Sequence, residues 1–330
     1  MLRRTIANGH LEEDRMLTRR DCLALTAGAC GALALPRLLS AQQGGAVITR
    51  PIPSTGQQIP IIGLGSSATF SRAAGAEDYE AVRGVLRALV DNGGTVFDTA
   101  PGYGASEEVA GRVADELGLR DRLFWATKLN VAGFRSPTPA DPAAARRQVE
   151  TSIERLGREP VDLIQVHNLA DMATQYPILE EYKQAGRVKY IGATTTFKPQ
   201  YEQLERLLRE QRFDFIGIDY AVDNRSAEER IFPLAQERGT AVMVYMPFGR
   251  TRLWQRVEGR EVPDWAREFG AETWAQFFLK FAASHPAVTV VTPATSRVEH
   301  MIDNMGAARG RLPDEAERRR MVELIEGLPS

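Results

Sequence analysis

Four side chains with acid–base chemistry lie at or just beyond the ends of three successive apolar segments. Asp98 lies near the end of TVFDTA, Tyr103 follows five residues later, Lys128 ends LFWATK and His167 lies near the end of LIQVHN. If these segments are neighbouring parallel strands, their ends meet at one rim and the four side chains converge. An ammonium close to a phenol stabilises the phenolate and lowers the phenol pKa toward neutral pH, which suits Tyr103 to proton transfer.

Lys128 is informative because lysine is rare in this chain. Only five of the 41 basic residues are lysines, and the other four fall in segments expected to be helices or loops, where solvent exposure explains them. Lys128 instead follows the apolar run 123–127, so we expect its ammonium to be buried. A buried charge needs a partner, and Asp98 on the adjacent strand is the obvious one. A purely structural ion pair stays open as the alternative, as does a merely hydrogen-bonded His167.

These side chains require a scaffold of parallel strands. From Ile59 onward, β-branched-rich runs alternate with longer segments that carry apolar residues at helical spacing. The predicted strands are 59–65, 95–100, 123–128, 163–168, 190–195, 215–220, 241–247 and 288–294. The predicted helices are 77–91, 105–118, 141–156, 198–210, 227–238 and 297–309, with further helical segments at 272–284 and 314–327. Eight such units predict a single (β/α)8 TIM barrel over 46–330, with residues 42–58 at its base and its active site at the C-terminal ends of the strands.

A doubly wound dinucleotide-binding sheet is the rival fold. Gly63, Gly65 and Ala68 fit the glycine fingerprint of that fold after a strand. The fingerprint needs a helix directly after the glycines and an acidic residue about 20 positions on. Residues 70–75 are instead expected to form a loop, and the candidate acid, Asp98, lies too far along the chain. The barrel is therefore favoured.

Residues 1–41 are predicted to be a twin-arginine signal peptide. Arg19 and Arg20 precede an apolar run over 23–36 and a small-residue site at Ala41, and Met16 as the start would leave a short basic leader. The run is shorter than the about 20 apolar residues of a spanning helix. We therefore expect a bacterial protein that the twin-arginine export machinery carries to the periplasm, without stable membrane insertion after cleavage.

Other readings of the N-terminus stay open: an amphipathic helix or membrane anchor, and a lipoprotein signal at Cys30. Cys22 and Cys30 are the only cysteines, which excludes disulfides, thiolate metal sites and a cysteine nucleophile from the rest of the chain. The 41 basic residues face 43 acidic ones without a Lys/Arg-rich tract, so nucleic acid is not an expected partner. No cluster of metal ligands is seen in the barrel sequence, and we expect no metal.

The sequence around the four side chains resembles the aldo-keto reductase family. FDTAPGYGASEEVAGRVADEL (97–117) is similar to the family's FDTA-x-x-YG-x-SE segment. VETSIERLGREPVDLIQVHN (149–168) is similar to its SL-x-RL…D-L-x-x-H region. The resemblance extends over about 59–309 and matches all four side chains to the family's catalytic tetrad.

The resemblance implies NAD(P)(H)-dependent carbonyl reduction or alcohol oxidation by direct hydride transfer. Tyr103 would be the general acid in reduction and the general base in oxidation. Lys128, held by Asp98, would lower the Tyr103 pKa, and His167 would position the substrate oxygen. The substrate would be a small carbonyl compound or alcohol.

The resemblance also implies cofactor contacts on strand ends, on the loops after them and in the helix predicted over 297–309. The cofactor contacts would be Thr194, Thr195, Tyr245 (stacked on the nicotinamide), Pro247, Phe248, Gly249, Ser296 and Arg297 (at the adenosine phosphate), and Asn304 (at the adenine). Asn168 and Trp254 lie in loops after predicted strands and are candidates for the wall of the substrate pocket, and a packing role stays open as the alternative for each. An arginine near a helix N-terminus suits a 2′-phosphate, which favours NADP(H) over NAD(H).

The sequence departs from the family pattern where the nicotinamide carboxamide would bind. The family's Gly-x-Ser-Asn is Gly-Ala-Thr-Thr here, and its strand-six glutamine is Gly217, although Tyr220 is retained. Thr194 can replace a serine hydroxyl, whereas Thr195 and Gly217 cannot replace two amides. Asp219 could substitute in part or serve a polyol substrate. Two alternatives therefore stay open: a cofactor-binding sensor or regulatory barrel with little turnover, and an enzyme whose tightly held cofactor is loaded before export.

Overall fold

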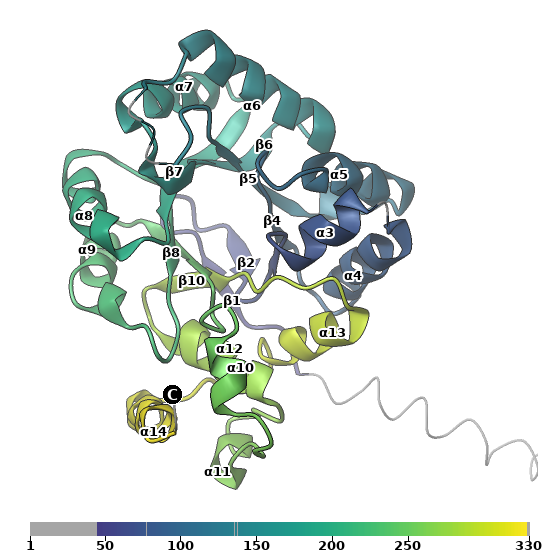
Figure 1. The fold of residues 1–330 in the computed structure, drawn as a ribbon, viewed down its shortest axis with the longest axis vertical. Coiled ribbons are helices and arrows are strands. Elements are labelled where there is room, and N and C mark those ends of the chain that lie inside the picture. Colours follow the sequence, from purple (N-terminus) through teal and green to yellow (C-terminus); the bar gives the residue numbers. More distant parts are fainter. Residues whose placement is uncertain (1–44, 77, 135, 137, 329–330) are drawn as a thin grey trace, which may run out of the picture. The chain divides into compact units, whose positions relative to one another are not determined.

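Eight parallel strands form the centre of the molecule, and helices surround them (Figure 1). The computed structural model describes residues 45–328, except 77, 135 and 137. The strands are β3 (Leu64–Gly65), β4 (Val96–Asp98), β5 (Phe124–Leu129), β6 (Val161–Val166), β7 (Val188–Thr195), β8 (Phe215–Asp219), β9 (Ala241–Tyr245) and β10 (Val288–Val291). They pair in chain order, and bridges from Ile62 to Val291 and from Gly65 to Ala294 join the last strand to the first. The predicted single (β/α)8 barrel is therefore confirmed.

The helices begin and end where local chemistry favours it. They are α3 (Thr69–Gly75), α4 (Tyr79–Asp91), α5 (Ser106–Glu116), α6 (Pro142–Leu156), α7 (Met172–Gln184), α8 (Tyr201–Glu210), α9 (Ile231–Glu237), α10 (Arg252–Arg256), α11 (Asp264–Arg267), α12 (Trp274–Ser284), α13 (Val298–Gly306) and α14 (Glu315–Glu326). The 3-10 turns are η1 (Arg120–Arg122), η2 (His167–Leu169), η3 (Lys198–Gln200) and η4 (Ser226–Glu228). In α6, the Asp141 carboxylate accepts hydrogen bonds from the first turn, and Gly157 ends the helix at a left-handed φ of 62°.

Four helices were not predicted: α3, α7 and the short helices α10 and α11 in the segment after β9. The loop expected over 70–75 is helix α3, because Phe70 is fully buried and its ring lies 5.2 Å from that of Phe97. α7 lies between β6 and β7, where Pro177 within the segment argues against a helix. Asp171 starts α7 by accepting a hydrogen bond from the Thr174 backbone N–H at 3.3 Å. In α3 and α7 tertiary burial outweighs weak local signals.

A short hairpin covers the base of the barrel. The strand predicted over 59–65 is two elements, because β2 (Gln58–Pro60) pairs antiparallel with β1 (Thr49–Pro51) outside the barrel sheet. Ile52 and Ile59 of the hairpin pack with the lowest inward-facing side chains of the strands. The described part of the predicted base segment therefore lies where we expected it.

One lysine contradicts the expectation of solvent exposure. Lys280 in α12 is fully buried, and its Nζ donates to the backbone carbonyls of Arg309 at 2.6 Å and Arg311 at 3.1 Å. The ammonium thus holds the segment between α13 and α14 against α12. The prediction was wrong because the sequence does not reveal that this segment passes over α12.

The described residues, 45–328 with three gaps, form one compact unit. The predicted signal peptide, residues 1–41, lies outside them. None of the helices described is long and apolar enough to cross a bilayer. No group of three or more His, Cys, Asp or Glu side chains in the described part of the chain could hold a metal ion.

Candidate active site

Strand alternation points Asp98 and Lys128 into the barrel. Val96 in β4, and Phe124 and Ala126 in β5, belong to the interior cluster, so the residues two further along face inward as well. Asp98 and Lys128 are only 3% and 2% exposed. Lys128 Nζ lies 2.9 and 2.8 Å from the two Asp98 carboxylate oxygens and 2.8 Å from the Thr99 carbonyl oxygen. The expected buried ion pair is therefore present.

Tyr103 lies on the turn between β4 and α5, above that ion pair. Gly104 allows the turn with a left-handed φ of 59°. Lys128 Nζ is 5.1 Å from the centre of the Tyr103 ring. Burial raises the pKa of Tyr103 above its usual value of 10, and the Lys128 charge opposes that rise without reversing it. The net direction is opposite to the one predicted, because burial outweighs the ammonium. The phenol is consequently protonated at neutral pH, as a proton donor must be.

His167 follows β6 and lies beside Tyr103. The two rings meet edge to face, with centroids 5.9 Å apart. Burial, reinforced by the charge of Lys128, lowers the pKa of His167 to about 3. His167 Nδ1 is buried and has no hydrogen-bond partner in the described structure. The imidazole is therefore neutral at physiological pH and suited to orienting an oxygen atom.

The two threonines at the end of β7 face opposite ways. Thr194 lies at the rim, where its hydroxyl accepts a hydrogen bond from the Asn168 backbone N–H at 3.1 Å. Asn168 itself has a left-handed φ of 58°, an uncommon backbone conformation that fixes the turn after His167. The Thr195 hydroxyl instead donates to Gln200 Oε1 at 2.6 Å, away from the tetrad. The structure therefore brings Thr194 and Asn168 to the tetrad, but not the Thr195 hydroxyl.

Tyr245 extends from β9 into the barrel, where a residue missed in the sequence contacts it. Its hydroxyl accepts from Gln165 Nε2 at 3.0 Å and lies 3.2 Å from Asp98 Oδ1. A Cβ atom on Gly217 would lie 2.4 Å from Tyr245 Cε2, so glycine leaves the space that the ring fills. Gln165 stands two residues before His167 in a buried strand, and that same-face spacing was the signal available in the sequence.

The loop after β9 places the other predicted contacts around an aromatic cluster. Pro247 and Gly249 are buried, and the Phe248 ring lies 4.9 Å from that of Trp254. Trp254 is 39% exposed. Arg250 has a left-handed φ of 62°, and strained backbone of this kind is concentrated at functional sites.

A pocket of about 360 Å³ lies between the loops after β7, β8 and β9. Its lining residues are Thr196, Lys198, Asp219, Ala221, Asp223, Asn224, Met246, Gly249, Arg250 and Arg252. Both carboxylate oxygens of Asp219 are engaged, one by the Tyr201 hydroxyl at 2.8 Å and the other by Asn224 Nδ2 at 2.6 Å. The pocket combines cationic side chains with carboxylates, and the sequence predicted only Gly249 and Asp219 within this set.

The predicted adenosine contacts lie at α13, after β10. Ser296 and Arg297 precede the helix, and Asn304 within it is 3% exposed. Arg297 Nε donates to Glu299 Oε1 at 2.6 Å. The guanidinium that would meet a 2′-phosphate is thus already paired with a carboxylate.

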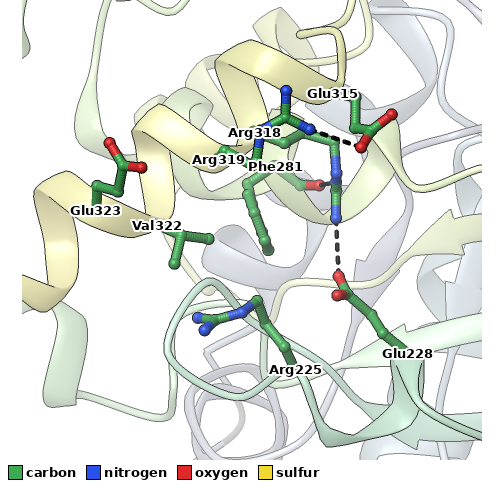
Figure 2. A pocket seen from close by; sticks show the side chains of 8 residues that line it. All are labelled: Arg225, Glu228, Phe281, Glu315, Arg318, Arg319, Val322 and Glu323. Carbon is green, nitrogen blue, oxygen red and sulfur yellow. Dashed lines mark hydrogen bonds and ion pairs between the residues drawn. The ribbon is translucent and has the colours of Figure 1, made fainter.

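A second crevice of about 360 Å³ lies among α12, α14 and η4 (Figure 2). Arg318 donates to Glu228 at 2.9 Å, and Arg319 donates to Glu315 at 2.6 Å. These cations are neutralised by their partners. The crevice therefore lacks the buried acid–base constellation found at the barrel rim.

The fold and the tetrad define a class of protein that the family comparison identifies. Residues 61–324 match the model of the aldo/keto reductase family. The chain belongs to the aldo/keto reductase family and is an NAD(P)-dependent oxidoreductase of that class.

Its relatives are similar over much of the barrel. Aldo-keto reductase YhdN of Bacillus subtilis is 31% identical over 204 residues, which cover 59% of this chain but only 60% of that protein. Aldo-keto reductase str7 of Strobilurus tenacellus is 27% identical over 73% of this chain and 81% of its own. An aldo-keto reductase from Klebsiella pneumoniae, solved in complex with NADPH, shares the fold with a TM-score of 0.70 and 24% identity, over 85% of this chain and 96% of that one.

Proposed function

We propose that this protein interconverts a small carbonyl compound and its alcohol by direct hydride transfer, with Tyr103 as the general acid or base. The observation that carries the proposal is the buried Lys128–Asp98 ion pair beneath Tyr103 and next to His167. A charge pair so completely removed from water costs free energy, which a role in chemistry explains better than a role in stability.

The residues present fit a nicotinamide nucleotide. The Tyr245 ring offers an aromatic face, the Thr194 hydroxyl a polar contact, and Arg250 beside Gly249 a guanidinium group that suits a diphosphate. When bound, the nucleotide supplies or takes up the hydride. NADP(H) is our proposed cofactor in preference to NAD(H), because the Klebsiella pneumoniae relative is in complex with NADPH and Arg297 could bind a 2′-phosphate.

The tetrad would handle the proton. In reduction, the protonated Tyr103 phenol gives its proton to the carbonyl oxygen as that oxygen gains charge. Lys128 stabilises the phenolate left behind, and Asp98 keeps the ammonium charged and in place. The neutral His167 imidazole orients the oxygen. In oxidation the same groups act in reverse, with Tyr103 as the base.

Replacing one hydroxyl tests this proposal. We expect Tyr103→Phe to lower kcat/KM at least a hundredfold, as for loss of a general acid, while the Kd for NADPH stays within about twofold. Tyr182→Phe is the matched control, because the Tyr182 hydroxyl contacts Glu150 at 2.7 Å in the helical layer. Turnover on a panel of aldehydes and ketones, with NADPH and NADH titrated by fluorescence, measures both quantities. Undiminished turnover by Tyr103→Phe would overturn the role of Tyr103.

A cofactor-binding sensor is the second candidate, since Thr195 is turned away and Gly217 has no side chain to hold a carboxamide. Tight NADPH binding by the wild-type chain without turnover across the panel would favour the sensor. A nucleotide released from the purified protein by denaturation would instead favour a cofactor loaded before export.

We further propose that the chain is exported to the periplasm by the twin-arginine machinery. Arg19 and Arg20 precede the short apolar run over 23–36, as in such signals. This route carries folded proteins, so a cofactor bound in the cytoplasm would travel with the barrel.

A further inference from the structure

The tetrad is connected to a hydrogen-bond chain that crosses the barrel. Gln165 Nε2 donates to the Tyr245 hydroxyl at 3.0 Å, and that hydroxyl lies 3.2 Å from Asp98 Oδ1. Asp98 in turn accepts two hydrogen bonds from Lys128. Gln165 comes from β6 and Tyr245 from β9, and β7 and β8 lie between these two strands in the sheet. The chain therefore joins two strands to the ion pair without passing through Tyr103.

Donor and acceptor accounting fixes the direction of this chain. An amide nitrogen only donates, so Gln165 occupies a lone pair of the Tyr245 hydroxyl and leaves the hydroxyl proton for another acceptor. Two acceptors are within reach: Asp98 Oδ1 and, at 3.4 Å, Met243 Sδ. A carboxylate is a far stronger acceptor than a thioether. The Tyr245 proton therefore points to Asp98.

On this basis, and resting on the proposed function, we propose that Gln165 is a positioning residue that holds the Tyr245 hydroxyl as a donor to Asp98. Gly217 belongs to the same arrangement, because a side chain there would collide with the Tyr245 ring and hydroxyl. The glycine and Gln165 thus act together: the first makes room for the ring, and the second fixes its hydroxyl.

The effect of the hydrogen-bond chain on the ion pair follows from the burial of Asp98. Burial raises the pKa of Asp98, while Lys128 and the hydrogen bond from Tyr245 oppose that rise. A donor to the carboxylate keeps the proton on Lys128, so the pair stays ionic rather than neutral. Only the ionic pair places an ammonium beneath Tyr103, where it stabilises the phenolate.

Weakening the chain should therefore make Tyr103 harder to deprotonate. The charged or titratable groups that face Tyr103 are Asp98, Lys128, His167, Tyr245 and Arg250. His167 is neutral above a pH of about 3, and its pKa does not reach the range of the phenol. In the reduction direction Tyr103 must hold its proton, so the basic limb of the kcat/KM profile, where Tyr103 loses that proton, reports on the phenol.

The test is a double-variant cycle read from that limb. Gln165→Met keeps the length of the side chain without its amide, and Tyr245→Phe removes only the hydroxyl. We expect each to move the basic limb upward by about half a pH unit, and the double variant to move it no further, because both break one chain. Met243→Leu, a near-isosteric change at the other contact of the hydroxyl, should leave the limb unmoved.

The measured position of the basic limb in each variant supports or contradicts the role of Gln165. An unmoved limb in a folded Gln165→Met, or shifts that add in the double variant, would overturn the role of Gln165. If Gln165→Met does not fold, Tyr245→Phe decides alone, and an unmoved limb there overturns the proposal. If the wild-type protein turns over and Tyr103→Phe abolishes that turnover, an unmoved limb contradicts the role of Gln165 and not the proposed function. A wild-type chain without turnover would instead contradict the proposed function.

Discussion

At the residue scale, the four tetrad side chains were predictable because each ends or follows a buried strand. Gln165 was not singled out, because its partner Tyr245 lies 80 positions away and only the closed barrel brings them together. The direction of the Tyr103 pKa shift was also mispredicted. The charge of a neighbour can be inferred from sequence, whereas the extent of burial that opposes it cannot.

Variants of the Asp98–Lys128 pair can separate its contribution to stability from its contribution to turnover. Asp98→Leu alone leaves a buried ammonium without its partner and should lower the free energy of unfolding by about 3 to 5 kcal/mol. Adding Lys128→Met removes the stranded charge, so we expect most of that stability to return while turnover stays lost. Urea unfolding and the carbonyl assay measure the two effects. Turnover by the double variant would mean that the pair is only structural.

At the element scale, all eight strands were found near their predicted positions, because buried parallel strands are continuous apolar runs. The first prediction merged β2 with β3, since both are apolar and adjacent. Four helices were missed: α3, α10 and α11 are short, and α7 contains a proline. Each depends on burial against neighbouring elements that a single sequence does not display.

The burial of Lys280 between α12 and the segment after α13 predicts that the free energy of unfolding depends on pH. Burial lowers the pKa of Lys280 from 10.5 to about 8, so the unfolded chain binds more protons between those values. The stability that this group contributes therefore rises with pH across that window, by about 2 kcal/mol from pH 8 to pH 10. We expect Lys280→Met to lack this rise.

The comparison is made between the two proteins at each pH, because other groups titrate in both. Lys183→Met is a matched control, as the Lys183 side chain is 40% exposed and paired with Asp214. Equal slopes for wild type and Lys280→Met, from urea unfolding at pH 8, 9 and 10, would contradict the buried ammonium.

At the scale of the whole molecule, the family match extends from residue 61 to residue 324. The barrel described here lies beyond the predicted signal, so export and chemistry can be separated by mutation. Arg19→Lys with Arg20→Lys should hold the full-length chain in the cytoplasm, because twin-arginine signals are recognised through that pair. Cell fractionation with immunoblotting measures the distribution.

An upstream arginine pair provides the control for export. Arg3→Lys with Arg4→Lys makes the same change in an arginine pair that does not adjoin the apolar run over 23–36, and it should not change the distribution. Periplasmic accumulation of the Arg19/Arg20 variant would contradict twin-arginine export, and the assay for turnover on purified protein is independent of that outcome.

The hairpin at the base has an electrostatic consequence. Ile52 and Ile59 close the end of the barrel opposite the tetrad, and the hydroxyl of Tyr190 binds Thr55 at 2.7 Å from within. Water cannot approach the Lys128–Asp98 pair from below, so the local dielectric constant stays low and the field of the ammonium is weakly screened. β1 and β2 contribute no side chain to the tetrad, but by excluding water they strengthen the electrostatic effect of Lys128 on Tyr103.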